Sequence, residues 1–285
     1  MIYDGSTLES IEKSLANIFN IEKEALIEKI IDYYFNNIDE FDKNEYLYED
    51  FIESIGVDDT KVVFDYINLF HVISSIDNLD TIKKFGLLDL KESLIRETSL
   101  KKYLSKIGIN FILTDSVNLT YKDLKYDLSK YNKDNTSTNT EYWKAYYAEY
   151  LFHRLSFDYN INGFLFLDNA CIDDSYLDLK NESEFFNRLK MFIGDNNLFD
   201  EWLENSCSYI LKCTVKTGQA TLGNGLKWEE EAIEAKKLTK QLIDVSIRII
   251  VDMEVRGEVR YPSEYVLVKN NVIIPFTDIE ILDYK

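Results

Sequence analysis

The stretch YINLFHVIS, residues 66–74, decides the fold that we expect for this chain. Its short run of apolar and β-branched side chains predicts a buried β-strand. Asp77 then stands where a helix would be capped, apolar residues follow at helical spacing, and Gly86 provides a stop for that helix. The order of strand, helix and turn therefore marks the start of a mixed α and β domain at Tyr66.

The 65 residues before this strand have a different character. They contain 17 acidic and 5 basic side chains, a net charge of −12, and Ser6 is placed to cap a first helix. The apolar residues at helical spacing are Leu8, Ile11, Leu15 and Ile18 in that helix and Ile21, Leu26, Ile30 and Tyr34 in a second one. We therefore predict an acidic helical module over residues 1–65 and a second domain over residues 66–285.

Helices and strands alternate after the first strand. We predict a helix near residues 91–106, an exposed polar loop at residues 126–140, and then a helix with an aromatic stripe that we expect in the core. That stripe consists of Trp143, Tyr146, Tyr147, Tyr150 and Leu151. Strands are expected at NGFLFLD (162–168) and SYILKCTVK (208–216).

The C-terminal part changes in character again. A last amphipathic helix carries apolar residues up to Leu242, and the runs that follow are rich in β-branched residues. We expect strands at VSIRIIVDMEV (245–255), YPSEYVLVK (261–269), VIIPF (272–276) and DIEIL (278–282). Helices first and a cluster of strands at the end favour the α+β class over a parallel doubly wound sheet.

Composition limits the classes of function. The 285 residues include 46% apolar side chains, enough for a large core, and the net charge of −19 would repel the backbone of a nucleic acid. Three cysteines without a C-x-x-C pair and only two histidines predict free thiols and no metal site. The start of the chain has no signal-like segment, and Arg248 and Asp252 interrupt the strongest apolar run, so we expect a cytoplasmic protein without a membrane span.

Three short segments carry side chains that make chemical sense together. The first, LFHVISSIDNLDTIKKFGLL (69–88), contains His71 on the predicted strand. The second, NGFLFLDNACIDDSY (162–176), contains a Gly-Phe pair on a strand and then Tyr176. In the third, YPSEYVLVK, Glu264 opens a late strand.

These segments resemble the ADP-ribosyltransferases of the diphtheria-toxin and poly(ADP-ribose) polymerase branch, which are built around a His, Tyr, Glu set. His71, Tyr176 and Glu264 match this set in order and in local context, and the resemblance spans about residues 66–285. It implies a split β-sheet core with helices. It also implies that NAD is a substrate whose nicotinamide–ribose bond is cleaved, with transfer of ADP-ribose to an acceptor.

The resemblance assigns catalytic roles to Glu264, His71 and Tyr176, and it implies that NAD is bound by His71, Ser74, Gly163, Phe164 and Tyr176. The chemistry gives an independent reason for these residue types. A carboxylate near the ribose stabilises the positive charge that develops as the glycosidic bond breaks. An aromatic face can stack on nicotinamide, and an imidazole can position a ribose hydroxyl.

Three positions depart from the family pattern. Ile73 stands where a Thr or Ser is usual, with Ser74 one place later, and this weakens the ribose contact. Leu165 replaces a second aromatic residue of the nicotinamide pocket. Pro262 stands two residues before Glu264, where arginine-modifying relatives carry Glu or Gln, so an arginine acceptor is disfavoured.

Other interpretations stay open. A lone histidine on an apolar strand is often structural, as we expect for His153, and Glu254 and Glu258 compete with Glu264 for its role. A second hypothesis is an acidic interaction or immunity protein whose residues 1–65 cover a basic partner. A third is a catalytically degenerate transferase fold. If the chain is a transferase, its acidic balance favours a protein acceptor over a nucleic acid.

Overall fold

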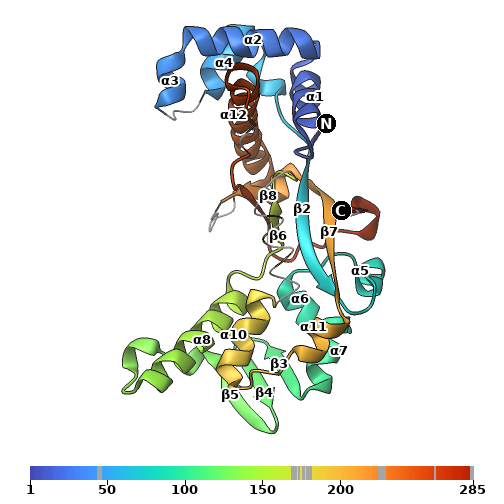
Figure 1. Cartoon of the computed structure of the whole chain (residues 1–285), viewed down its shortest axis with the longest axis vertical. Helices are drawn as coiled ribbons and strands as arrows, with labels where there is room; N and C mark the ends of the chain where they lie inside the picture. Colours follow the sequence, from blue (N-terminus) through green and yellow to red (C-terminus); the bar gives the residue numbers. More distant parts are fainter. Residues whose placement is uncertain are drawn as a thin grey trace. The chain divides into compact units, whose positions relative to one another are not determined.

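The computed structural model describes residues 1–43, 47–167, 172, 174, 177, 182–223, 229–259 and 261–282 (Figure 1). It mixes helices and sheet, in agreement with the predicted α+β class. The chain forms two compact units, each built from three segments. The first unit consists of Met1–His71, Asn162–Asp173 and Lys212–Lys269, and the second of Val72–Ile161, Asp174–Leu211 and Asn270–Lys285.

A β-sheet forms the centre of the first unit. Its strands are β1 (Ile2–Tyr3), β2 (Tyr66–Ser75), β6 (Asn162–Phe164), β7 (Cys207–Lys216), β8 (Ala220–Leu222) and β9 (Tyr265–Val268), of which β2 and β7 continue into the second unit. They are neighbours in the order β7, β2, β6, β9, β8, and β1 pairs in parallel with the start of β2. β6 is antiparallel to both β2 and β9. The strands predicted around residues 66–74 and 208–216 are therefore confirmed.

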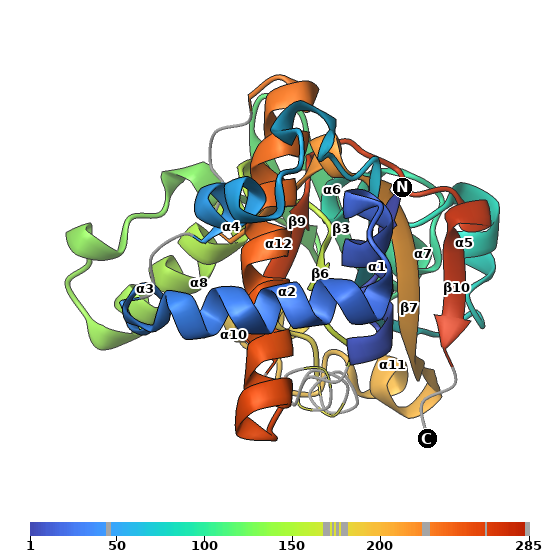
Figure 2. The same cartoon turned by 90° about the horizontal axis from the view of Figure 1, so that it is seen from above.

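Helices from distant parts of the sequence pack together in the first unit. They are α1 (Leu8–Phe19), α2 (Lys23–Asn36), α3 (Ile38–Asp42), α4 (Tyr48–Ile55) and the long α12 (Glu231–Arg256), with the short η1 (Asp59–Lys61) and η4 (Thr217–Gln219). Figure 2 shows α2 lying across α12, and α1 and α4 also contact α12. The predicted N-terminal helices are confirmed, but Thr7 and not Ser6 caps α1, because the Thr7 hydroxyl accepts the Ser10 N–H.

Helix α12 includes residues 245–255, for which the sequence predicts a strand, and that prediction is wrong. The β-branched side chains of this run favour a strand locally. However, buried apolar residues recur at helical spacing from Leu238 to Ile250, and Gly257 ends the helix in the left-handed conformation at φ 71°. The packing of α12 against other helices therefore overrides the local preference.

Residues 1–65 share their core with α12. The buried N–H of Phe64 donates to Thr239 Oγ1 at 3.0 Å, and Tyr3 Oη lies 2.9 Å from Ser246 Oγ. The division into compact units consequently differs from the predicted boundary at residue 66. The boundary differs because the N-terminal helices cover the apolar faces of α12.

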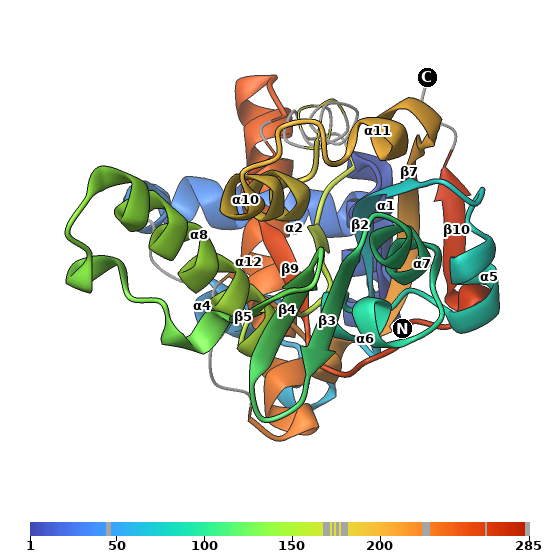
Figure 3. The same ribbon diagram turned by 90° about the horizontal axis from the view of Figure 1, so that it is seen from below.

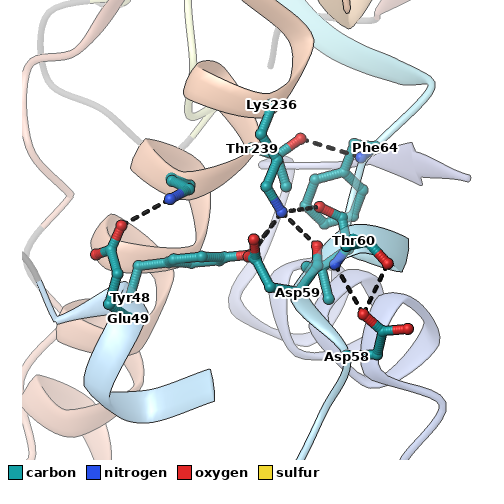
Figure 4. A network of polar contacts seen from close by, with 10 residues as sticks. Tyr48, Glu49, Asp58, Asp59, Thr60, Phe64, Lys236 and Thr239 are labelled. Carbon is teal, nitrogen blue, oxygen red and sulfur yellow. Dashed lines mark hydrogen bonds and ion pairs between the residues drawn. The ribbon is translucent and has the colours of Figure 1, made fainter. Parts of the chain in front are cut away.

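Lys236 of α12 joins several parts of this N-terminal region (Figure 4). Its Nζ donates to Tyr48 Oη at 3.0 Å, to Asp59 Oδ1 at 2.7 Å and to the Val62 carbonyl at 3.1 Å, and Tyr48 Oη also donates to Asp59. The Lys236 ammonium, together with the Tyr48 hydroxyl, holds the pKa of Asp59 below its usual range. One side chain thus ties α12 to α4 and to η1.

The second unit has a core of its own. A three-stranded antiparallel sheet contains β3 (Ile109–Leu113), β4 (Val117–Tyr121) and β5 (Leu124–Asp127), none of which the sequence pattern predicted. The other elements are α5 (Asp80–Phe85), α6 (Leu90–Ile95), α7 (Ser99–Lys106), α8 (Asn139–Ser156), α10 (Glu184–Ile193), α11 (Asp200–Asn205), β10 (Ile279–Leu282) and the short η2 (Leu128–Lys130), η3 (Lys133–Asn135) and η5 (Phe276–Asp278). Figure 3 shows α8 and α10 side by side, and the stacked rings of Phe186 and Phe199, 4.1 Å apart, belong to the core.

Three sequence predictions in this unit need correction. The stripe Trp143, Tyr146, Tyr147, Tyr150 and Leu151 lies only partly in the core: Leu151 is buried and Tyr147 and Tyr150 pack against the core, but Trp143 is 47% exposed. The other buried residues of α8 are Ala145, Ala148 and Leu155. The small alanines allow α10 to approach closely, and the aromatic rings flank that contact. The polar stretch 126–140 is anchored by Leu128, which is buried in the core, and the predicted strand 272–276 contributes only an isolated bridge from Ile274 to Leu87.

Within the described residues, no helix has both the length and the apolar character that crossing a membrane requires.

We predict that Lys236→Met destabilises the protein by about 1–2 kcal/mol, because Tyr48 and Asp59 lose a charged partner that is mostly shielded from water. Urea unfolding at pH 7 measures this change. Lys237→Met, at the exposed neighbouring position, is the matched control and should stay within about 0.5 kcal/mol of the wild type.

The pH dependence of the same pair has a defined sign. A carboxyl whose pKa is lowered on folding stabilises the folded state above its unfolded pKa, and this stabilisation is lost as the pH falls through the folded pKa. The difference between the wild type and Lys236→Met should therefore shrink as the pH is lowered below about 4. A constant difference down to pH 2 would contradict the role given to Asp59.

Candidate functional site

Strand β2 carries the first predicted site residue. Residues Ile67–Phe70 of this strand are buried, and His71, which follows them, is half-buried. His71 Nδ1 lies 2.6 Å from the Asn162 carbonyl oxygen of β6. Because a carbonyl oxygen can only accept, Nδ1 carries the proton in this contact, and Nε2 is the acceptor nitrogen of the neutral ring.

The pairing of β2, β6 and β9 relates His71 to Glu264. Phe70 pairs with Phe164, and Phe164 pairs with Tyr265. One position further on, the Leu165 N–H donates to the Glu264 carbonyl at 3.0 Å. Since paired residues in antiparallel strands point to one face and successive residues alternate, the register assigns His71 and Glu264 to the same face, on strands that flank β6.

Gly163 lies between these two strands, opposite His71 on one side and paired with Val266 on the other. A Cβ atom added to Gly163 would come within 2.6 Å of Leu69 Cδ1 and 2.9 Å of the Phe70 carbonyl oxygen. The spacing of β2 and β6 therefore requires glycine here. The face between His71 and Glu264 is left with an apolar floor, to which the buried side chains of Leu69 and Val266 contribute.

Phe164 belongs to the opposite face of the sheet. Its ring is buried and lies 5.0 Å from the ring of Tyr265. In this position it packs the far side of β6 and β9, not the face that carries His71. The geometry therefore does not place Phe164 on the face where the resemblance expects NAD.

Ser74 does not lie on the His71 face. Alternation along β2 puts Ser74 on the other face of that strand, and within the second unit its hydroxyl accepts the Trp202 indole N–H at 3.1 Å. Tyr176 lies outside the described residues, as do Asp168 and Asn169.

The carboxylates that compete with Glu264 have different surroundings. Glu254, for which the sequence predicts a strand, is exposed in the last turn of α12, and Glu258 follows the end of that helix. Glu264 is half-buried at the start of β9, and its own N–H donates to the Pro262 carbonyl at 2.8 Å. Of the three acids, Glu264 is the one next to β6.

Comparison of the chain with models of known protein families, with curated proteins and with solved structures finds no match. Across the part of the chain that is described, no group of three or more His, Cys, Asp and Glu side chains is arranged to hold a metal ion. The case for this site therefore depends on the strand register and on the chemistry of the residues themselves.

We predict that Gly163→Ala destabilises the protein by about 1–3 kcal/mol, because the new methyl group collides with the backbone of Phe70 and with Leu69. Thermal unfolding measures the loss. Asn162→Ala is the control: its side chain is exposed, and the backbone carbonyl that contacts His71 is retained. Equal melting temperatures for Gly163→Ala and wild type would show that β2 and β6 are not this close.

The hydrogen bond to Asn162 also predicts the tautomer of His71. At pH 8, nitrogen-15 NMR should find the His71 proton on Nδ1, because the Asn162 carbonyl oxygen can only accept a hydrogen bond. The exposed ring of His153, the second histidine of the chain, provides an internal reference. A His71 proton found predominantly on Nε2 would rule out the contact.

Proposed function

We propose that the chain is an NAD-dependent ADP-ribosyltransferase that cleaves the nicotinamide–ribose bond. The observation that carries this proposal is the register of three adjacent strands. β2, β6 and β9 bring His71, the Gly-Phe pair and Glu264 together in the sheet, with His71 and Glu264 assigned to one face. This adjacency is what the resemblance to the His, Tyr, Glu branch of the family requires of segments that are distant in sequence.

The proposed chemistry divides the work between two described residues. Glu264 lies close to the ribose and stabilises the oxocarbenium-like sugar as nicotinamide departs. His71, with its proton on Nδ1, accepts a hydrogen bond from a ribose hydroxyl through Nε2 and so orients the sugar. The resemblance gives the nicotinamide stacking to Tyr176.

The acceptor of ADP-ribose is proposed to be a protein side chain and not a nucleic acid. The net charge of −19 opposes the approach of a polyanion. Pro262 stands where arginine-modifying relatives carry an acidic or amide side chain, which disfavours arginine as the acceptor group. Water remains the simplest acceptor to test, because NAD hydrolysis needs no second substrate.

The decisive variant is Glu264→Gln, which keeps the volume and the hydrogen-bonding capacity but removes the negative charge. If the carboxylate acts on the transition state, NAD affinity should stay within about threefold while turnover falls by about a hundredfold or more. Nicotinamide release measured by chromatography gives the turnover, and calorimetry gives the affinity.

Glu254→Gln and Glu258→Gln are matched controls, since both carboxylates are exposed and lie outside the three strands. Each should retain turnover within about threefold of the wild type. Equal turnover in Glu264→Gln and wild type would remove Glu264 from the mechanism. Binding of NAD without nicotinamide release by the wild type would instead indicate a degenerate transferase fold.

A further inference from the structure

A buried carboxyl group joins the start of α4 to α12 within the first unit. Asp244 of α12 has only 6% of its surface exposed. Its Oδ1 accepts the N–H of Leu47, the residue that precedes α4, at 3.0 Å. Leu47 provides no side-chain cap for α4, so an acid from another helix takes that role.

The second oxygen of this carboxyl group is buried without compensation. No donor among the described residues forms a hydrogen bond with Asp244 Oδ2. Gln241 Oε1, one turn earlier on α12, is also buried and has no donor in the described part of the chain. A proton on Asp244 Oδ2 removes the charge and supplies a donor on the side of α12 where Gln241 lies.

The capping contact does not itself need a negative charge. An asparagine oxygen would also accept the Leu47 N–H, as side-chain amides do at the starts of other helices. The charged carboxylate loses its hydration when it is buried, whereas the protonated carboxyl group loses much less. The free energy of the contact between α4 and α12 therefore depends on the charge of Asp244.

The charged groups around Asp244 act in opposite directions. Arg248, one turn further along α12, favours the ionised carboxylate, and Glu49 of α4 opposes it. Lys240 is paired with Glu49 at 2.6 Å, and Lys236 belongs to the network in Figure 4. The ionisable side chains that line the cavity beside Asp244 are Tyr48, Glu49, Lys236, Lys237 and Lys240.

Desolvation outweighs these neighbours. It raises the pKa of Asp244 to about 6, although the backbone N–H groups of Leu47 and Tyr48 and the charge of Arg248 favour the ionised form. The carboxyl group consequently changes its charge between about pH 5 and pH 7.

We propose that the contact of Asp244 with α4 is a pH-sensitive switch: α4 is held firmly while Oδ2 carries a proton, and its first turn separates from α12 more often once the carboxyl group is ionised. Separation lets water reach the charged oxygen, so ionisation favours every state in which α4 has moved away. Tyr48, which accepts a hydrogen bond from Lys236, moves with α4. The proposal is independent of NAD cleavage, and it holds or fails whatever the activity at Glu264.

The direction of the effect is fixed by the raised pKa. An acid whose pKa is raised on folding stabilises the folded state below its unfolded pKa, and this stabilisation is lost as the pH rises through the folded pKa. With pKa values of about 3.9 unfolded and about 6 folded, the folding equilibrium constant should fall about tenfold between pH 5 and pH 7 through Asp244 alone.

The variant Asp244→Asn removes this titration and keeps an oxygen for the Leu47 N–H. Urea unfolding should find that the ratio of its folding constant to that of the wild type is about tenfold larger at pH 7 than at pH 5. All other groups titrate in both proteins and cancel in this ratio. Glu254→Gln, which removes an exposed carboxylate of the same helix, is the control, and its ratio should stay constant within about twofold. A constant ratio for Asp244→Asn overturns the proposal.

Amide hydrogen exchange locates the separation on the wild-type chain. After correction for the intrinsic exchange rates, protection of the Leu47 N–H and of the α4 amides should fall about tenfold from pH 5 to pH 7. The same amides of Asp244→Asn, and those of β4 in the second unit, should keep their protection. An equal fall in Asp244→Asn would assign the effect to another group and so overturn the proposal.

Carbon-13 NMR of the Asp244 carboxyl carbon tests the titration directly. The midpoint is expected near pH 6. A midpoint below about pH 4.5, close to that of an exposed aspartate, would show that Asp244 is ionised throughout the range and that no switch exists.

Discussion

The close approach of β2 and β6 at Gly163 is the contact on which the candidate site depends. β6 is only three residues long, yet it pairs with β2 on one side and with β9 on the other. The Asn162 carbonyl orients His71, and the Leu165 N–H that follows β6 holds the start of β9 at Glu264. A side chain at position 163 would push β6 away from β2 and disturb both arrangements together.

The sequence predicted secondary structure best where the local pattern agreed with the tertiary packing. The run 66–74 is short, apolar and β-branched, and it forms β2; the helical spacing of the first 36 residues appears in α1 and α2. In α12 the local composition and the tertiary packing favour different structures. Residues 245–255 have the composition of a strand, but they continue a helical face that starts at Leu238 and is buried by α1, α2 and α4 at the start of the chain. No window of local sequence contains those partners.

The candidate site could be predicted only in part for a similar reason. Order along the chain suggested His71, Gly163 and Glu264, and the strand register makes their strands neighbours. The resemblance also assigns Ser74 and Phe164 to the site, although odd spacing along a strand turns a side chain to the other face. Ser74 is three residues from His71 and Phe164 is one residue from Gly163, so alternation alone would have separated them. Asp244 had no sequence signal beyond being an acid within an apolar helical run.

The net charge of the chain does not distinguish acidic side chains that lie in different environments. In the first unit Asp59 and Glu49 are paired with Lys236 and Lys240. The Lys240–Glu49 pair is partly exposed, so water screens it and it contributes little alone. Lys236 is more buried, and it also donates to Tyr48 and to the Val62 carbonyl. Asp244 is different, because it lies inside the contact between α4 and α12 and a buried carboxylate must be compensated by partners or by protonation. The Leu47 N–H donates to Asp244 Oδ1 at 3.0 Å and so compensates one oxygen. Desolvation still raises the pKa of this carboxyl to about 6, although the backbone N–H groups of Leu47 and Tyr48 favour the ionised form.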